Sequence, residues 1–294
     1  MITILIPAYN ASRYITKCLS SIGKQTYKEF EVVIVDDCSS DATVSVVEEF
    51  KKHVSFPILV IKNSRNLGVS MVRNILLRQV KGEFFYFIDA DDFLEANALE
   101  CLFKIATEKS ANIVTADFYL DDEHSLITVH VPADSAESQR KCNIAGKWAV
   151  VWRSLYRTSY IEEIGLKFPE NINGGEDYFF VSKASVDTDK IIHVSDAFYH
   201  YRLSNQNSIM RSVNIQGLSD QFAATKLLEE SISEKDKFQD EFYKRYLYLK
   251  KETFKTALKS WKWHTEANNV KIIKSFGLKD KIVFFIMSLL SKML

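Results

Sequence analysis

The sequence is short of cysteine, carries no net charge and contains no long hydrophobic run. It has four cysteines in 294 residues, and no two of them have the C-x-x-C spacing typical of zinc and redox sites. Scattered cysteines of this kind fit a reducing cytoplasm. Lysine plus arginine number 38, as do aspartate plus glutamate. Nucleic-acid-binding proteins usually carry a basic excess, so we expect no nucleic-acid partner.

Several local signals are missing as well. The N-terminal stretch MITILIPAYN has no basic region ahead of an apolar core, so it does not resemble a signal peptide. No segment reaches the roughly 18 apolar residues that a membrane span requires. The sequence lacks G-x-x-x-x-G-K-[ST], which argues against a P-loop nucleotidase. It also lacks G-x-G-x-x-G, which argues against a dinucleotide-dependent oxidoreductase.

The first third of the chain instead shows a regular alternation of strands and helices. Four apolar runs predict strands, and each is followed by a segment with apolar residues at helical spacing. The runs are Thr3–Ile6, Phe30–Val35, Ile58–Ile61 and Phe84–Ile88. This alternation predicts a parallel sheet covered by helices on both faces.

The pattern changes after residue 112. Further strands are predicted at 113–119, 126–131, 191–194 and 198–202, whereas the polar segment 133–143 is predicted to be a mobile loop. Trp148, Trp152 and Tyr156 recur at helical spacing. From Ile215 onward the chain is predicted to be helical almost to its end.

Polar and charged residues follow each of the four N-terminal strands. Because ligands bind at the carboxyl ends of strands in open α/β sheets, we expect these residues to meet at one edge. They are Tyr9, Asn10, Asp36, Asp37, Asn66, Arg73, Asp89, Asp91 and Asp92. An aromatic ring can stack on a base, arginine can neutralise phosphate, and nearby carboxylates can hold a divalent cation. This edge is therefore predicted to bind a metal and a nucleoside diphosphate.

Three stretches resemble family 2 glycosyltransferases of the GT-A fold. They are ITILIPAYNASRYITKCLSSIGKQTYKEFEVVIVDDCSSDAT, SRNLGVSMVRN and GEFFYFIDADDFLE. The resemblance implies an α/β protein with a Rossmann-like, mixed but mostly parallel sheet flanked by helices, and a helical C-terminal region. It implies a catalytic domain over residues 1–212, with a nucleotide-binding half (1–110) and an acceptor-binding half (111–212). Residues 213–294 are then the helical region with a basic amphipathic tail.

The resemblance also implies roles for residues at the strand ends. Asp89 is implied to reach the ribose or the metal, and Asp91 to bind the metal that bridges the diphosphate, Mn²⁺ or Mg²⁺. For Asp92 we favour a helix N-cap or a local hydrogen-bond acceptor, and Asp36 is balanced between the base pocket and a turn-stabilising acid. The residues implied to bind the nucleotide part of the donor are Pro7, Tyr9, Asp37, Asn66 and Arg73.

A second group of acids lies at Gly174-Gly175-Glu176-Asp177. Taken alone, an acid at a glycine-rich turn before an apolar helix is more often a helix N-cap than a catalytic group. Downstream of the Asp89–Asp92 stretch, it resembles the Glu-Asp motif of the family. The resemblance implies that Asp177 is the general base and that Glu176 supports it or contacts the acceptor.

Three further candidates lie downstream of the acids. His200 resembles the late histidine that GT-A enzymes use as a metal ligand, although a lone histidine on a strand is usually structural. Arg202 is a candidate to contact the diphosphate. Trp152 resembles an aromatic residue of the family's acceptor-binding wall, and ordinary core packing is an equal alternative.

The C-terminal end is basic and partly apolar. From Lys244 onward twelve basic residues face three acidic ones, and the last seventeen residues read LKDKIVFFIMSLLSKML. We expect this tail, Leu278–Leu294, to lie on a membrane surface. The alternative is a helix packed on the domain or on a second subunit of a homo-oligomer.

Together these features predict an inverting glycosyltransferase that moves a sugar from a UDP-sugar to a hydroxyl of a saccharide acceptor. The tail favours a lipid-linked oligosaccharide acceptor in bacterial cell-surface polysaccharide synthesis, with the protein cytoplasmic and peripheral on the inner face of the membrane. Two alternatives are a sugar nucleotidyltransferase on a similar sheet and a non-catalytic scaffold that binds nucleotide-sugar or membrane. The first typically has a glycine-rich N-terminal loop, which is absent here.

Overall fold

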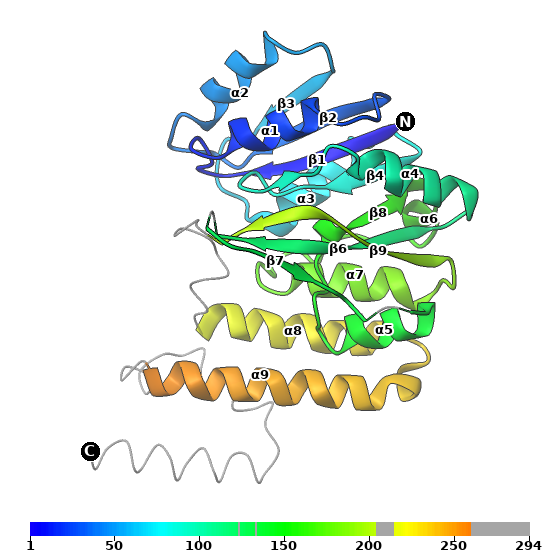
Figure 1. Cartoon of the computed structure of the whole chain (residues 1–294). Helices are drawn as coiled ribbons and strands as arrows, with labels where there is room; N and C mark the ends of the chain where they lie inside the picture. Colours follow the sequence, from blue (N-terminus) through cyan, green and yellow to red (C-terminus); the bar gives the residue numbers. More distant parts are fainter. Residues whose placement is uncertain (123, 133, 204–214, 260–294) are drawn as a thin grey trace.

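The computed structural model describes residues 1–294 except 123, 133, 204–214 and 260–294 (Figure 1). Its first third alternates strands and helices as the sequence predicts. The elements are β1 (Ile2–Ala8), α1 (Ile15–Gly23), β2 (Phe30–Asp36), α2 (Thr43–Lys51), β3 (Ile58–Lys62), α3 (Val69–Leu77), β4 (Phe84–Phe87), β5 (Phe93–Leu94) and α4 (Ala98–Glu108).

The remaining described elements complete the sheet and add a helical layer. They are β6 (Ile113–Asp121), β7 (Leu126–Val129), α5 (Ala136–Ile144), the 3₁₀ turn η1 (Val151–Arg153), β8 (Ser154–Arg157), α6 (Thr158–Glu163), α7 (Glu176–Val186), β9 (Ile191–Arg202), α8 (Ile215–Ser231), η3 (Lys235–Phe238) and α9 (Gln239–Lys259).

All nine strands form one mixed sheet. Its order is β3-β2-β1-β4-β8-β6-β9-β5, and β7 pairs with β6. The pairs β3–β2, β2–β1 and β1–β4 are parallel, whereas β8 pairs antiparallel with both β4 and β6. The predicted α/β class with a mixed sheet is confirmed. The parallel N-terminal half places the carboxyl ends of β1, β2 and β4 at one edge.

Alternating residues of the strands send their side chains to two apolar cores. Ile4 and Val32 pack with α1, α2 and α4 on one face, whereas Leu5 and Val33 pack with α3, α6 and α7 on the other. β4 is buried throughout, because both of its faces are covered by helices. The FFYF run is therefore the centre of the fold, and the acids that follow it emerge directly from the core.

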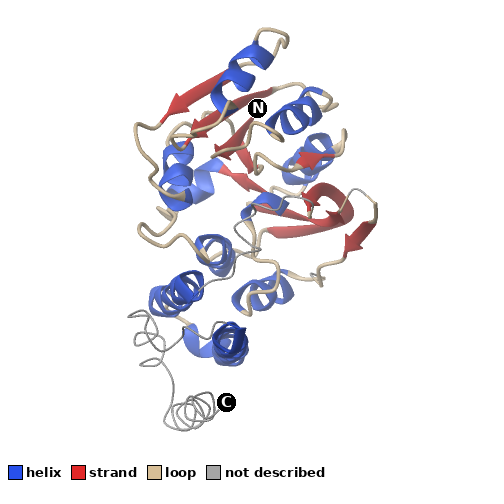
Figure 2. Cartoon of the chain, turned by 90° about the vertical axis from the view of Figure 1, so that its left-hand side faces the viewer, coloured by secondary structure: helices blue, strands red, loops and turns tan. Residues whose placement is uncertain are grey.

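Three helices are stacked below the sheet. α7 packs against α8, α8 packs against α9, and α5 contacts α7 and α9. Figures 1 and 2 show α9 as the described helix farthest from α2 and β3. None of the described helices is long and apolar enough to cross a membrane. The predicted domain boundary at 212/213 and the Leu278–Leu294 tail lie outside the described residues.

Two local predictions were wrong. The polar segment 133–143 is largely helix α5, whose first turn is stabilised because the Ser135 hydroxyl accepts a hydrogen bond from Ser138 N at 3.1 Å. The Trp148–Tyr156 segment is not a helix but η1 followed by β8. There, pairing with β4 and β6 overrides the helical spacing of the aromatic residues.

Candidate active site

Side chains from three parallel strands converge at the carboxyl edge of the sheet. Tyr9 follows β1, and its ring is 54% exposed. Pro7 lies opposite Val35, and Ala8 lies opposite Asp36, so β1 and β2 end side by side. Asn66, in the loop after β3, is exposed. These residues occupy the edge at which a nucleotide was expected, and their roles in binding one remain predictions.

Asp37 organises the loop between β3 and α3. Its Oδ1 accepts hydrogen bonds from Asn63 Nδ2 at 2.8 Å and Leu67 N at 2.9 Å, and its Oδ2 accepts one from Gly68 N at 2.9 Å. The carboxylate is buried, and these three donors fix its orientation. Asp37 can therefore bind a nucleotide base only through carboxylate lone pairs that these three hydrogen bonds do not use.

Arg73 connects the nucleotide half of the sheet to α7. Its guanidinium is 4% exposed, and Nη1 bonds both Glu176 Oε1 (2.7 Å) and Asp177 Oδ1. Nη2 lies 3.4 Å from Asp89 Oδ1. One arginine thus holds three acids that the sequence assigned to two different motifs.

Burial and neighbouring negative charges raise the pKa values of Asp177 and Asp89. Burial raises the pKa of Asp177 to about 7, because Glu176 and Asp89 add to the effect and Arg73 opposes it only in part. Burial likewise raises the pKa of Asp89 to about 6, against the opposing charge of Arg73. For Arg73, burial disfavours the charge, but the three acids outweigh burial and raise its pKa. Asp177 is therefore poised to exchange a proton near neutral pH.

Asp92 ties the acidic stretch to β9. Its Oδ2 accepts a 2.6 Å hydrogen bond from the Tyr199 hydroxyl, and its Oδ1 accepts one from Arg202 N at 2.8 Å. The Tyr199 hydroxyl also accepts a bond from Asp89 N at 3.1 Å. Asp92 is thus a structural hydrogen-bond acceptor, but neither the helix N-cap nor the local acceptor that we favoured, because its partners are distant in sequence. Tyr199, which the sequence analysis missed, positions Asp89 and Asp92 together.

Comparison with known proteins identifies the family of this site. A family model described as "Glycosyl transferase family 2" matches residues 3–165. The chain belongs to glycosyl transferase family 2. The implied family and the GT-A type of fold are therefore confirmed.

Curated relatives of family 2 match most of the chain. Poly(ribitol-phosphate) beta-N-acetylglucosaminyltransferase TarS of Staphylococcus aureus (strain MW2) is 28% identical over 228 residues, which cover 72% of this chain and 37% of TarS. Putative glycosyltransferase EpsH of Bacillus subtilis (strain 168) is 30% identical over 222 residues, which cover 71% of this chain and 63% of EpsH. The matched region thus spans little more than a third of TarS.

Solved structures share the fold across nearly the whole chain. TarS 1-349 in complex with UDP-GlcNAc superposes with a TM-score of 0.76 at 23% identity, covering 93% of this chain and 78% of that chain. The mannosyltransferase PcManGT from Pyrobaculum calidifontis, in complex with GDP-Man and Mn²⁺, gives 0.63 at 18% identity, covering 99% and 80%. At these identities the likeness establishes the fold alone.

The surroundings of His200 do not favour its predicted role as a metal ligand. His200 Nε2 lies 2.8 Å from Glu95 Oε1, and Nδ1 lies 3.2 Å from Asp121 Oδ2. The imidazole also stacks on the Phe93 ring, with centroids 4.2 Å apart. Both ring nitrogens face carboxylates, which favours the structural alternative for His200.

The prediction that Trp152 lines the acceptor wall also needs correction. Its side chain is 4% exposed and stacks on the rings of Tyr199 (4.2 Å between centroids) and Tyr201 (5.7 Å). Phe118 contacts its edge. These rings cover Trp152, so no sugar can stack on it, and the residue belongs to the core.

Two donors of Arg202 have no partner in the part of the chain that the structure describes. Its Nε and Nη2 are buried, and neither has a hydrogen-bond partner among the described residues. The guanidinium lies over the Tyr14 ring at 5.2 Å, and the backbone N–H of Arg202 is held by Asp92. Buried donors without partners are costly, so this position suits an anionic ligand.

Asp89 and Asp91 carry the kind of oxygen ligand that a hard divalent cation prefers. Carboxylate oxygens suit Mg²⁺ and Mn²⁺. Within the described residues, no group of three or more His, Cys, Asp and Glu side chains could hold a metal ion. The two acids therefore fit a cation that completes its coordination with substrate phosphates and water, rather than one enclosed by protein.

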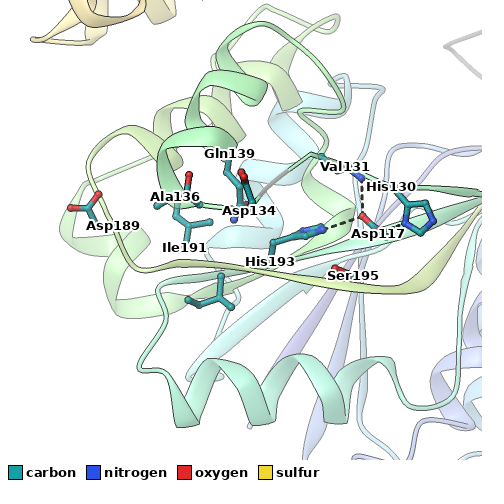
Figure 3. Close-up of a pocket in the computed structure, with 12 residues that line it drawn as sticks. Asp117, His130, Val131, Asp134, Ala136, Gln139, Asp189, Ile191, His193 and Ser195 are labelled. Carbon is teal, nitrogen blue, oxygen red and sulfur yellow. Dashed lines mark hydrogen bonds and ion pairs between the residues drawn. The ribbon is translucent and has the colours of Figure 1, made fainter.

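A cavity of about 620 Å³ lies apart from these acids, between α5 and the first half of β9 (Figure 3). Asp117 binds His130 Nδ1 at 2.6 Å, Val131 N at 2.9 Å and His193 Nε2 at 3.1 Å. These bonds tie the segment after β7 to β6 and β9. The cavity contains none of the predicted site residues, and its polar network is explained by this structural role.

Proposed function

We propose that this chain is an inverting glycosyltransferase that transfers a sugar from a UDP-sugar to a hydroxyl of a saccharide acceptor in cell-surface polysaccharide synthesis. The observation that carries the proposal is the cluster in which Arg73 holds Asp89, Glu176 and Asp177. In support, the pKa of Asp177 is raised by burial, and Arg73 joins this carboxyl group to Asp89. Residues 1–110 then form the nucleotide-binding half, and residues 111–212 the acceptor-binding half.

Asp177 is the proposed general base. It accepts the proton of the acceptor hydroxyl as that oxygen attacks the anomeric carbon of the donor sugar. The bond from the anomeric carbon to the diphosphate breaks in the same step, so UDP leaves and the configuration inverts. Glu176 keeps Asp177 in place through their shared partner, Arg73.

The donor edge is proposed to bind UDP. The ring of Tyr9 stacks on the base, and Pro7, Asp37 and Asn66 line its pocket. Arg73 and Asp89 face the rest of the nucleotide, and Arg202 neutralises the diphosphate with its unsatisfied donors. A UDP-sugar is favoured because the similarly folded TarS is described in complex with UDP-GlcNAc.

A divalent cation, Mn²⁺ or Mg²⁺, is proposed to be held by Asp91 and Asp89. When bound, it supplies Lewis-acid stabilisation of the negative charge on the departing diphosphate. The mannosyltransferase of similar fold is described with Mn²⁺, which supports a cation requirement here.

The acceptor is proposed to be a lipid-linked oligosaccharide at the inner face of the cell membrane. The support is the excess of basic residues after Lys244 and the apolar tail Leu278–Leu294. Association of this cytoplasmic protein with the membrane is then peripheral, and a homo-oligomer through the C-terminal third is the alternative use of that region.

The direct test is release of UDP over a panel of UDP-sugars, with and without simple saccharide acceptors. We expect one donor to be turned over with a divalent cation present and little turnover in EDTA. A nucleotidyltransferase would instead release pyrophosphate from NTP and a sugar phosphate. A scaffold would bind UDP-sugar but release no UDP with any donor and acceptor.

A further inference from the structure

The outer face of α9 carries a row of large apolar side chains. Tyr243, Leu247 and Tyr248 are 68%, 53% and 50% exposed, although most side chains of this size in the described chain are covered. Tyr243 and Leu247 are four positions apart and adjoin on the helix surface, and Tyr248 lies beside them on the same exposed half of α9. We call these three residues the α9 stripe.

The stripe faces away from the other described elements. The opposite side of α9 is occupied by Phe242 and Leu249, which are buried, and α9 packs there against α8 and α5. Figures 1 and 2 show no described element beyond α9 on its outer side. The stripe is therefore not covered by any part of the chain that the structure describes.

Basic side chains border the stripe. Lys244 and Lys251 are exposed on the same side of α9. Between residues 239 and 253 one acidic side chain is exposed, that of Asp240, one turn before Tyr243. Glu241 is buried, and its Oε1 lies 3.7 Å from Lys244 Nζ. The surface therefore combines tyrosine, leucine and lysine, and it becomes more basic toward the C-terminal end of α9.

We propose that the α9 stripe, with Lys244 and Lys251, docks on an anionic lipid surface. Tyrosine suits the membrane interface, because its ring is apolar and its hydroxyl stays hydrated, and lysine binds anionic headgroups. The row from Tyr243 to Lys251 is only about 12 Å long, at 1.5 Å per residue. Three apolar side chains in so short a row form a small patch, whereas each partner in a stable protein interface buries roughly 800 Å², which argues against a second copy as the occupant. The inference deepens the membrane location in the proposed function, but it rests on residues other than the tail.

The test is co-sedimentation of the full chain with vesicles of phosphatidylglycerol or of phosphatidylcholine. We expect binding to phosphatidylglycerol and little binding to phosphatidylcholine. The variant Tyr243→Ser/Leu247→Ser/Tyr248→Ser should bind phosphatidylglycerol at least about tenfold more weakly. Lys244→Glu/Lys251→Glu should weaken binding to a similar degree, and added salt should reduce the difference. The matched control is Leu126→Ser/Ile127→Ser on β7, since those side chains are 53% and 56% exposed elsewhere.

Two results would overturn the proposal. In the first, the stripe variant sediments with phosphatidylglycerol vesicles as fully as the unmodified chain. In the second, the stripe variant changes the molar mass measured by light scattering while lipid binding persists, which would make the face a protein interface. Thermal unfolding should be unchanged, because the replaced side chains are exposed. UDP release with a water-soluble acceptor separates lipid docking from the proposed function. If the unmodified chain releases no UDP, the proposed function is contradicted, whereas the result on lipid binding still stands.

Discussion

At the scale of single residues, Asp177 combines an arginine partner with a raised pKa. An ion pair alone would lower the pKa of a carboxyl group, and Arg73 does act in that direction. Burial and the neighbouring Glu176 and Asp89 outweigh it. An acid held in a fixed position by arginine, yet protonated and deprotonated near neutrality, is suited to general-base chemistry.

Removing the carboxylate of Asp177 should abolish most activity. We expect Asp177→Asn to lower kcat about 10² to 10⁴-fold, the usual contribution of a positioned base, while UDP binding is retained. UDP release measures the first effect, and calorimetry with UDP measures the second. Asp187→Asn, just after the end of the same helix, is the control and should keep activity. Unchanged UDP release in Asp177→Asn would exclude Asp177 as the base.

The raised pKa of Asp177 predicts a pH profile. A base works only when deprotonated, so kcat/KM should rise with pH and level off above the pKa, near pH 7. Because Arg73 lowers this pKa, Arg73→Met should move the rising limb to higher pH. A rising limb near pH 4, the ordinary range of aspartate, would contradict the assignment.

Asp91 should determine metal-dependent binding. We expect Asp91→Ala to remove the gain in UDP affinity that Mn²⁺ gives, because a cation would lose one of its two carboxylates. Calorimetry with Mn²⁺ and with EDTA measures that gain. Asp196→Ala, an exposed acid on β9, is the control and should retain it. Equal Mn²⁺ dependence in both variants would remove Asp91 from the metal site.

At the scale of elements, α7 begins at a position that only glycine fits well. Gly175 has φ +86°, and a Cβ there would lie 3.2 Å from Gln221 Cα in α8. Glu176 and Asp177 follow at once, so the backbone of this turn sets where the two acids point. The packing of α8 on α7 therefore helps to position the active site.

Gly175→Ala should impair both stability and activity. We expect a loss of about 1–2 kcal/mol for the left-handed conformation, with a further loss from the contact with α8 and a lower kcat. Gly165→Ala is the matched control, since Gly165 also has positive φ (+58°) but nothing within 4 Å of its Cβ. Chemical unfolding and UDP release measure the two effects. Equal stability and activity in both variants would show that the contact with α8 is unimportant.

The elements that were predictable from sequence are those determined locally. The run Phe84–Ile88 predicted a strand, and β4 spans Phe84–Phe87, because a buried parallel strand is a continuous apolar run. β8 was not predictable, since it forms by pairing with β4 and β6. Likewise, the sequence predicted that Arg73 and Asp89 meet at one edge, but not that Arg73 also binds Glu176 and Asp177. The surroundings of His200 and Trp152 were not predictable either, because Glu95, Asp121 and Tyr199 come next to them only in the folded chain.

At the scale of the whole molecule, charge is distributed unevenly. The chain is neutral overall, yet from Lys244 onward basic residues exceed acidic ones by nine, so the remainder carries a matching acidic excess. Such an uneven charge distribution orients a protein at an anionic surface, with its basic end toward that surface.

Truncation of the tail tests the membrane contact that we propose for it. A chain lacking Leu278–Leu294 should partition less into membranes than the full chain, because both apolar and basic side chains are lost. Flotation of cell membranes measures the partition. UDP release with a soluble acceptor should be unchanged. If the truncated chain partitions as fully as the intact one, the tail is not an anchor.

The stacking of α7 on α8 and α8 on α9 sets a minimum reach for the acceptor. Neighbouring packed helices lie 8–10 Å apart between axes, and α5 contacts both α7 and α9, so Asp177 would stand about 10–20 Å above a membrane that α9 touches. The hydroxyl to be glycosylated must reach that height. A longer saccharide chain on the lipid would extend to the base more readily than a short one. The thickness of two helical layers would thus select acceptors by length, before any contact with their sugars.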